Sequence, residues 1–433
     1  MTQTLSQIAI FGAGLSGLAA YQRACDLGIN CVIDDDKPIT ASLVDAQDAV
    51  PFSQWDWTGL DALVISPGVP LSHPSPHAVV KAALSHDVEV ISEIEFALRT
   101  GQWGKLVVIT GTNGKSTTTA LAGHILKEAG CDVAVGGNLG TAHSALRETE
   151  TGITILELSS YQLESTPSLQ PDIGCLLNIT PDHLDRHGGI DGYIAAKKRV
   201  LSALSASSLG LIGADGPLVS ALHDWAQSLP ASIEIIDAAS LPDTINNPYL
   251  AGAHNAQNAA FAARIAQSCG VSEQKIRDGL ASFIGLPHRL TPVAEIAGVS
   301  YVNDSKATNG DAASRALSAY QNIHWLAGGV AKEDGIGACL DYQSHIKAAY
   351  FYGQSAGAFA QESGTTLDHS SYKTMDDALA AAQGAAIAGD VILLSPAAAS
   401  FDQFDNFSAR GSHFESLVMA TTSQPDREVS HAR

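Results

Sequence analysis

The chain has 433 residues, enough for about three domains at roughly 150 residues each. Hydrophobic residues make up 45% and charged residues 16% of the sequence, a composition that builds buried cores and argues against a disordered chain. The 24 Lys and Arg against 45 Asp and Glu give a net charge of −21, which argues against binding to nucleic acid or to an anionic membrane surface.

Short apolar runs alternate along the chain with longer stretches of helical periodicity, which predicts βαβ units and largely parallel sheets. The apolar runs are continuous and do not alternate with polar residues, as in sheets that are covered on both faces. The fold class expected from this pattern is α/β. The predicted strands are residues 8–11, 31–33, 62–65, 106–110, 154–158, 174–177, 209–212, 299–303, 323–327, 348–352 and 391–394.

Two breaks in the pattern suggest domain boundaries. The first lies near residues 98–104, where a helical pattern ends in glycine before a new strand, and the second lies in a Pro/Gly break near residues 285–289. The expected domains are therefore residues 1–93, 94–285 and 286–433. Residues 421–433 are polar and lack apolar periodicity, so we expect this end to be mobile at least in part.

Other features indicate the compartment. The six cysteines are scattered without a CxxC pair, which predicts reduced thiols and neither a disulfide framework nor a zinc site. The first residues lack the basic and apolar segments of a signal peptide, and no apolar run approaches the ~20 residues that span a bilayer. We expect a soluble, cytoplasmic protein without membrane insertion.

A glycine-rich segment, Gly12-Ala-Gly14-Leu-Ser-Gly17, follows the first predicted strand and opens a helix, and Asp34 ends the next strand. Glycines let the backbone approach a diphosphate at a helix N-terminus, and the acid can hold a ribose hydroxyl. This context favours a nucleotide-type ligand over a tight structural turn. A second turn, Ser66-Pro-Gly68, follows the strand at 62–65 and should lie at the same sheet edge.

The segment Thr110-Gly-Thr-Asn-Gly-Lys-Ser-Thr117 follows the strand at 106–110 and is similar to a phosphate-binding loop. Backbone N–H groups would surround phosphates, Lys115 would reach the outer phosphates, and the Ser116 hydroxyl would bind Mg²⁺. Ile109 stands where the strict pattern has its first glycine. The alternative is a Gly-Lys turn that merely opens a helix, which the strand–turn–helix context disfavours.

Further candidate ligands follow neighbouring strands. Glu157 lies at the end of the strand at 154–158, and His183 follows the strand at 174–177. Each has a plain alternative, a solvated acid at a strand end and a loop histidine, but open α/β sheets bind ligands at this edge. Several of the few cations fall in Gly-, Pro- or Asn-rich segments: Lys115, Arg186, Arg289, Lys306, Lys332 and Arg410. One interpretation is that they cluster at an active site, and the alternative is that each is a solvated surface charge.

Together these segments resemble the Mur ligase family, in the family's order and over nearly the whole chain. The matching segments are Gly111-Thr-Asn-Gly-Lys-Ser116, Glu157-Leu-Ser-Ser-Tyr-Gln-Leu-Glu164, Asn178-Ile-Thr-Pro-Asp-His-Leu-Asp185, Ala196-Lys197, Gly252-Ala-His-Asn-x-x-Asn258, His288-Arg289 and Asp304-Ser-Lys-Ala-Thr-Asn309. Three segments resemble the D-glutamate-adding branch: Ser159–Glu164, Asp304–Asn309, and Ser395-Pro-Ala-Ala-Ala-Ser-Phe-Asp-Gln-Phe404 with Arg410-Gly411.

The resemblance implies an ATP-dependent amide ligase of peptidoglycan precursor synthesis, expected to be a monomer. A Rossmann-like N-terminal domain would hold the UDP moiety of UDP-N-acetylmuramoyl-L-alanine. A central P-loop-type ATPase domain with a mainly parallel sheet would bind ATP and Mg²⁺, and a Rossmann-like C-terminal domain would bring D-glutamate. ATP would phosphorylate the alanyl carboxylate, the amine of D-glutamate would attack the acyl phosphate, and phosphate would leave.

The resemblance also implies roles for individual residues. Lys115, Glu157, His183 and Lys197 would be catalytic, and His183 is one candidate to accept the proton of the reacting amine. One Mg²⁺ would be held by Ser116 and Glu157, and a second by His183 and a carbamylated lysine, for which Lys197 fits the family pattern and Lys198 is the alternative. ATP would contact Gly111, Thr112, Asn113, Gly114, Lys115, Ser116, Thr117, Asn258, Arg289, Asp304 and Lys306. The UDP-linked substrate would contact Gly14, Leu15, Ser16, Asp34, Ser66, Gly68, Asn138 and Ser159. D-Glutamate would contact Thr308, Lys332, Ser400, Phe401 and Phe407, although core packing is an alternative for both phenylalanines.

One segment departs from the family pattern. Asp34 is followed by Asp35-Asp36-Lys37, where relatives often carry a hydroxyl and then an arginine. Another amino-acid ligase of the same superfamily, for meso-diaminopimelate or for folate, is the nearest alternative function. A nicotinamide dehydrogenase would explain Gly12–Gly17 and Asp34 but not Lys115, and a non-catalytic nucleotide-binding protein would have no need of Lys115, Glu157 or His183.

Overall fold

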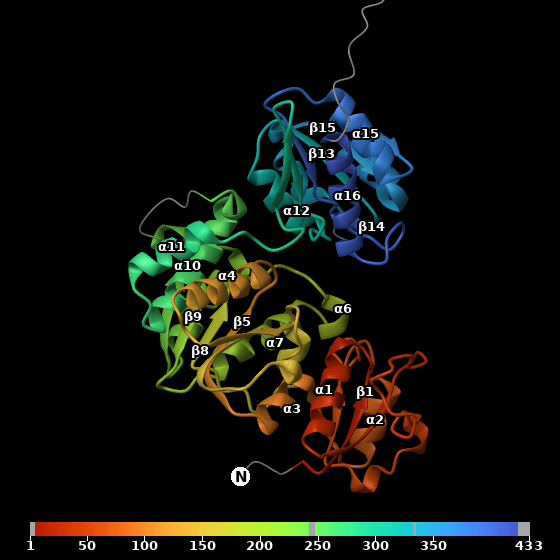
Figure 1. Ribbon diagram of the computed structural model, residues 1–433, viewed down its shortest axis with the longest axis vertical. Coiled ribbons are helices and arrows are strands. Elements are labelled where there is room, and N and C mark those ends of the chain that lie inside the picture. The colour runs from red at the N-terminus through yellow and green to blue at the C-terminus, as the bar shows by residue number, and fades with distance from the viewer. Residues whose placement is uncertain (1–4, 242–246, 332–334, 423–433) are drawn as a thin grey trace, which may run out of the picture. The chain divides into compact units, whose positions relative to one another are not determined.

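The computed structural model describes residues 5–241, 247–331 and 335–422 of the chain. The chain divides into two compact units: unit 1 comprises Met1–Pro242 and Gln257–Leu280, and unit 2 comprises Asp243–Ala256 and Ala281–Arg433. Unit 1 contains a four-stranded and a six-stranded sheet, and unit 2 contains a second six-stranded sheet and a two-stranded ribbon (Figure 1). Each large sheet falls within one of the three expected domains, whose limits stay a prediction.

The four-stranded sheet has the order β2-β1-β3-β4, and its neighbouring strands are parallel. Helices α1 and α3 pack on the face that carries Ile8 and Ile10, and α2 packs on the face that carries Ala9 and Phe11. Because β1 is covered on both faces, it is apolar from Ile8 to Phe11. The elements are β1 (Gln7–Phe11), α1 (Leu15–Asp26), β2 (Asn30–Asp34), β3 (Ala62–Ile65), α2 (Ala78–Ser85), β4 (Glu89–Ser92) and α3 (Glu93–Thr100).

The six-stranded sheet of unit 1 has the order β10-β9-β8-β5-β7-β6 and is parallel throughout. Strand β5 lies between β7 and β8, so the loop after β5 leaves the sheet where the strand order changes direction, the usual place for a ligand. The strands are β5 (Trp103–Thr110), β6 (Val133–Gly137), β7 (Thr149–Glu157), β8 (Ile173–Leu176), β9 (Leu209–Gly213) and β10 (Ser232–Ile236). The helices are α4 (Lys115–Glu128), α5 (Ser160–Glu164), α6 (Leu184–His187), α7 (Ile190–Ser202), α8 (Pro217–Ser220), α9 (His223–Gln227), α10 (Ala253–Ser268) and α11 (Glu273–Ser282).

The sheet of unit 2 has the order β11-β12-β17-β13-β15-β16, parallel except for the pair β11 and β12. Helices α12 and α14 pack on one face, whose core includes Trp325, and α15 and α16 pack on the other, whose core includes Leu326 (Figure 1). The strands are β11 (Thr291–Ile296), β12 (Val299–Asn303), β13 (Ile323–Gly328), β14 (Val330–Ala331), β15 (Ile346–Tyr352), β16 (His369–Tyr372), β17 (Val391–Leu394) and β18 (Ala398–Ala399). The helices are α12 (Gly310–Ser318), α13 (Gly337–Leu340), α14 (Ala356–Ser363), α15 (Met375–Ala385) and α16 (Phe407–Thr422).

The expected α/β fold with largely parallel sheets is confirmed, and every predicted strand is present to within a few residues. The strands that the apolar pattern missed are β4, β6, β10, β11 and β16 and the short ribbon strands. Residues 421–422 end α16, so they are helical, and the remainder of the expected mobile end lies outside the described residues. All six cysteines are free, as expected. In the described part of the chain, no helix is both long and apolar enough to cross a membrane.

Candidate functional site

The loop after β5 has the local structure of a phosphate-binding loop. Gly114 has φ +84°, and a Cβ there would lie 2.3 Å from the Asn258 side-chain oxygen, so both conformation and space favour glycine. Asn178 fixes the loop by accepting the Asn113 N–H at 2.9 Å and donating to the Asn113 carbonyl at 3.0 Å. Helix α4 begins at Lys115. The first backbone N–H groups of this helix therefore point into the loop.

Lys115 folds back over this loop. Its Nζ donates to the Gly111 carbonyl at 2.9 Å and to the Thr112 carbonyl at 2.7 Å. Ser116 is buried beneath the loop, and Thr117 is half-buried in the first turn of α4. A lysine held by carbonyls at the mouth of an anion-binding loop is placed to meet the outer phosphates of a nucleotide.

Glu157 ends β7 and is 2% exposed. Its Oε1 accepts from the Asn138 side chain at 2.9 Å, whereas its Oε2 is buried without a hydrogen-bond partner. A buried carboxylate oxygen with no donor is costly, and a hard cation would satisfy it. The residues therefore fit Mg²⁺, although no three His, Cys, Asp or Glu gather into a metal-binding group among the described residues.

Lys197 and Lys198 lie in different surroundings although they are adjacent in α7. Lys197 is 2% exposed, and its Nζ donates to the Gly111 carbonyl at 2.6 Å. Burial, with Lys115 nearby, lowers the pKa of Lys197 well below its ordinary range. The Lys198 ammonium lies 3.8 Å from the centre of the Trp225 ring.

One cavity of about 270 Å³ brings most of these side chains together. Its wall includes Lys115, Asn138, Ser159, His183 and Lys197, all of which the sequence singled out. His183 adopts φ +53° just before α6, and its ring lies 5.3 Å from that of Tyr161. The Ser159 hydroxyl caps α5 by accepting the Gln162 N–H. Other lining residues were given no role from the sequence, although all but Tyr193 lie within the quoted segments: Pro67, Ser160, Tyr161, Asp182 and Tyr193.

The two turns predicted to meet at the edge of the four-stranded sheet do so. Ser66 Oγ donates to the Gly12 carbonyl at 2.9 Å, and Gly68 belongs to the wall of the cavity. Gly14 is the N-cap of α1, and Leu15 and Ser16 in the first turn are exposed and half-buried, respectively. Asp34, expected to meet a ribose, accepts the Phe52 N–H at 2.8 Å through one carboxylate oxygen.

The remaining candidates are divided between the units. Asn258 lies beside the phosphate loop, where its side-chain oxygen accepts from Thr118 at 3.3 Å. The other ATP candidates, Arg289, Asp304 and Lys306, lie in unit 2. Lys306 Nζ is 4.0 Å from the centre of the Phe407 ring. The other D-glutamate candidates give a mixed picture: Thr308 is half-buried, Ser400 is buried, Phe401 is 73% exposed and therefore outside any core, and Lys332 lies outside the described residues.

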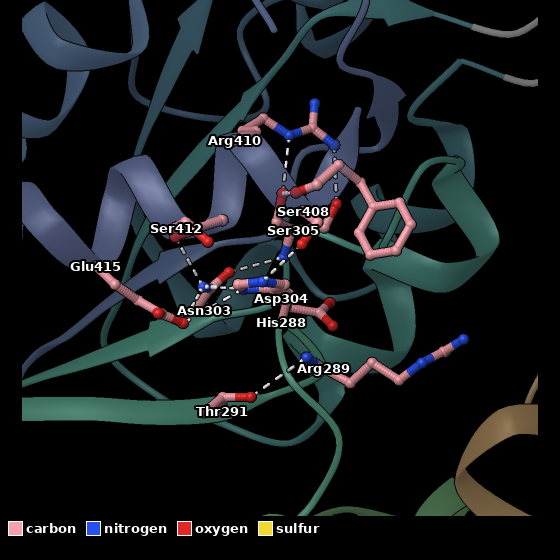
Figure 2. Close-up of polar contacts among 12 residues, drawn as sticks. His288, Arg289, Thr291, Asn303, Asp304, Ser305, Ser408, Arg410, Ser412 and Glu415 are labelled. Carbon is pink, nitrogen blue, oxygen red and sulfur yellow. Dashed lines mark hydrogen bonds and ion pairs between the residues drawn. The ribbon is translucent and has the colours of Figure 1, made fainter. Parts of the chain in front are cut away.

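Arg410 organises the carboxyl edge of the unit 2 sheet. It is fully buried, and its guanidinium donates to both the hydroxyl and the carbonyl of Ser305 (Figure 2). It also donates to the carbonyls of Gly328 and Ala398. Ser305 follows β12, Gly328 ends β13 and Ala398 lies in β18, so one buried cation holds three segments of the chain together. The Arg289 side chain extends away from this network in Figure 2.

Asp304 is the buried acid of this edge. Its carboxylate accepts from Ser395 Oγ at 2.8 Å and from the Leu290 N–H at 3.2 Å. Burial raises the pKa of Asp304 to about 7, opposed by these hydrogen bonds and by the charges of Arg289 and Arg410. Because the unfolded chain releases this proton near pH 3.8, the folded state binds more protons between these values. The free energy of unfolding should therefore fall as pH rises from about 4 to 7 and then level off.

Trp325 provides a measurement of this ionisation. Its indole N–H donates to the Ser395 carbonyl at 2.7 Å, and Ser395 in turn donates to Asp304. We expect the Trp325 indole ¹H–¹⁵N signal to shift with a midpoint near pH 7, and to lose this transition in Asp304→Asn. The other four tryptophans lie in unit 1 and serve as internal controls. The same transition in the variant would contradict the assignment.

Comparisons with known proteins give a consistent picture. A family model described as the Mur ligase middle domain matches residues 109–245, and a model described as the Mur ligase, glutamate ligase domain matches residues 288–398. A UDP-N-acetylmuramoylalanine–D-glutamate ligase from Caulobacter sp. (strain K31) is 40% identical, and the match covers 95% of each chain. A relative of the same name from Nitrobacter winogradskyi is 39% identical over 95% of this chain and 96% of the relative.

Solved structures share the fold at lower identity. UDP-N-acetylmuramate–alanine ligase MurC from Thermotoga maritima is 15% identical with a TM-score of 0.60, and the match covers 96% of this chain and 99% of that one. MurF ligase from Thermotoga maritima, in complex with ADP, is 14% identical with a TM-score of 0.60, and the match covers 96% and 95%. These two similarities support the α/β fold and nothing finer.

Proposed function

The chain belongs to the Mur ligase family, and from this premise we propose that it is the ligase that joins UDP-N-acetylmuramoyl-L-alanine to D-glutamate at the expense of ATP. The match to relatives of that name covers at least 95% of this chain and of each relative, which supports the choice of reactants. The cavity that combines the phosphate loop with Asn138, His183 and Lys197 is the observation that carries the proposal. The step belongs to peptidoglycan precursor synthesis.

The proposed reaction begins with a carboxylate that must approach an anionic triphosphate. ATP would transfer its outer phosphoryl group to the alanyl carboxylate, and the amine of D-glutamate would displace phosphate from the acyl phosphate. The positive charge of Lys115 would offset the repulsion between the reacting anions. Asn138 lines the cavity and donates one side-chain N–H to Glu157, and its second N–H would donate to an anionic substrate group.

Mg²⁺ would complete the neutralisation of the phosphate charge. One Mg²⁺ would be held by Ser116 and Glu157, and a second by His183 and carbamylated Lys197. Phosphate oxygens and waters would be the remaining ligands, since Mg²⁺ sites in such enzymes use few protein carboxylates. The unpaired Glu157 Oε2 supports this role.

The surroundings of Lys197 support carbamylation of this residue over Lys198. A neutral amine is needed to attack carbon dioxide, and burial favours the neutral form of Lys197. The amine would form a C–N bond to carbon dioxide and release one proton, which leaves an anionic carbamate. Lys115, which lines the same cavity, would then favour the anion.

Unit 2 would bind the D-glutamate substrate. The D-glutamate candidates Thr308, Ser400, Phe401 and Phe407 lie on segments after β12 and β18, at the carboxyl edge where α/β sheets bind ligands. The roles of these residues, the monomeric state and the cytoplasmic location stay predictions.

Phosphate release tests the proposal. The protein is incubated with ATP, Mg²⁺ and UDP-N-acetylmuramoyl-L-alanine, and D-glutamate, L-glutamate or meso-diaminopimelate is added in separate reactions. We expect release with D-glutamate alone. Release with another amino acid would keep the ligase reaction and change its specificity. No release with any of them would overturn the proposal and leave a nucleotide-binding α/β protein.

A further inference from the structure

The nucleotide edge of the four-stranded sheet is poor in positive charge, although the proposed substrate carries a diphosphate. Three consecutive acids, Asp34 at the end of β2 and then Asp35 and Asp36, come before a single lysine, Lys37. Asp35 Oδ2 already accepts the Ala13 N–H of the glycine-rich loop at 2.6 Å. A backbone donor that could face a phosphate therefore faces a carboxylate, and the diphosphate needs a cation from another element.

Arg186 is the cation that the described structure places on the turn of this edge. It lies in α6, three residues after His183, and its Nη1 donates to the Gly68 carbonyl at 3.1 Å. Its guanidinium lies 4.7 Å from the centre of the Tyr161 ring. Gly68 and Tyr161 both line the cavity of about 270 Å³, and Tyr161 and Arg186 also line a small adjoining hollow with Ser66.

The remaining donors of Arg186 point to a ligand. Its Nε is buried and has no hydrogen-bond partner. An unsatisfied donor beside a hydrogen-bonded Nη1 has an energetic cost that a purely structural link to Gly68 would not require. A phosphate oxygen would satisfy it, because the planar guanidinium can form two parallel hydrogen bonds to phosphate while the aromatic ring holds its plane.

We propose that Arg186 binds the diphosphate of the UDP-linked substrate and thereby makes the His183 segment part of the nucleotide site. The inference rests on the proposed function for the identity of the substrate. The chemistry that it requires is a nucleoside diphosphate at the Gly68 turn. Arg186 supplies the charge that the acids after β2 do not.

Kinetics with two acceptors tests the proposal. Arg186→Gln should raise the KM for UDP-N-acetylmuramoyl-L-alanine about 10–100-fold, the usual effect of losing charged hydrogen bonds, and change the KM for ATP and for D-glutamate less than about threefold. With N-acetylmuramoyl-L-alanine, which lacks both phosphates, the variant should equal the wild type. Arg186→Lys keeps the charge but loses the two parallel hydrogen bonds. Its KM for UDP-N-acetylmuramoyl-L-alanine should lie between those of the wild type and Arg186→Gln.

Arg199→Gln is the matched control. Arg199 Nε donates to the Leu163 carbonyl at 2.7 Å, so this variant also loses a guanidinium that holds a backbone carbonyl, but it is not among the residues lining the cavity. Arg199→Gln should change the KM for UDP-N-acetylmuramoyl-L-alanine and the KM for N-acetylmuramoyl-L-alanine by the same factor. An equal loss with both acceptors in Arg186→Gln would overturn the proposal, because Arg186 would then be only a structural link.

Direct binding keeps this inference separate from the proposed function. Calorimetry with UDP and with uridine needs no turnover. Arg186→Gln should weaken UDP binding about tenfold or more and leave uridine binding unchanged. Unchanged UDP affinity in a folded Arg186→Gln or Arg186→Lys variant would overturn the inference, whereas a wild type that binds UDP without releasing phosphate would overturn only the proposed function.

Discussion

Lys115→Met should abolish nearly all ligase activity, with a loss of about 10²–10³-fold or more in kcat. The Lys115 Nζ is held at the mouth of the phosphate loop by the Gly111 and Thr112 carbonyls, where the charge of a transferring phosphoryl group would develop. Removal of one preorganised donor from such a position commonly has an effect of this size. Because the charge on the bridging oxygen grows in the transition state, kcat should fall more than the affinity for ATP.

Lys105→Met is the control for this experiment. Lys105 lies in the same strand, β5, but it is exposed, and its Nζ is 3.5 Å from the Ser268 carbonyl. Single-turnover phosphate release and calorimetric binding of an ATP analogue would separate chemistry from binding. Turnover of Lys115→Met within tenfold of the wild type would contradict the assignment of the ATP site.

The apolar pattern predicted every interior strand of the three larger sheets but only one of their edge strands, β2, for a physical reason. Strands β5 and β13 are covered on both faces and are therefore continuously apolar towards their ends. The missed strands β4, β6, β10, β11 and β16 are all at sheet edges. Strand β16, His369–Tyr372, is partly exposed along its length, so burial imposes little on its sequence.

Motif spacing predicted which loops meet at the cavity, because parallel strands bring their carboxyl ends to one edge. The spacing did not reveal side-chain partners. Arg186 and Tyr161 come from different helices, and nothing in the sequence indicates that one stacks on the other. Similarly, Arg410 was noted as a scarce cation, but its burial among carbonyls from three segments of the chain depends on the tertiary fold.

The choice between Lys197 and Lys198 illustrates the same limit. Neighbouring residues on a helix point about 100° apart, so a shift of one residue exchanges the interior for the surface. The sequence selects Lys197 only through its match to the family pattern. The structure separates the two residues by their surroundings, the loop carbonyl of Gly111 for Lys197 and the Trp225 ring for Lys198.

Lys197→Ala should lose about 10–100-fold of the ligase activity, the usual effect of removing a group that supports a metal site, and short-chain carboxylic acids should restore part of it. The truncated side chain leaves room beside Gly111 in which formate or acetate can replace the carbamate oxygens. The positive charge of Lys115 at the same cavity would attract the added anion. Rescue should rise with acid concentration and saturate, and it should be greater with small acids than with bulky ones.

Lys198→Ala provides the matched comparison, because it removes an identical side chain one residue away. Its ammonium contacts the Trp225 ring, so the variant should stay within about threefold of the wild type and gain nothing from added acid. Carbon-13 NMR with ¹³C-bicarbonate gives a readout independent of turnover: the carbamate signal should be present in the wild type and in Lys198→Ala and absent in Lys197→Ala. Because only an uncharged amine can take up carbon dioxide, and burial lowers the pKa of Lys197, this lysine is expected to carry the modification. A carbamate signal that survives in Lys197→Ala and disappears in Lys198→Ala would reverse the assignment.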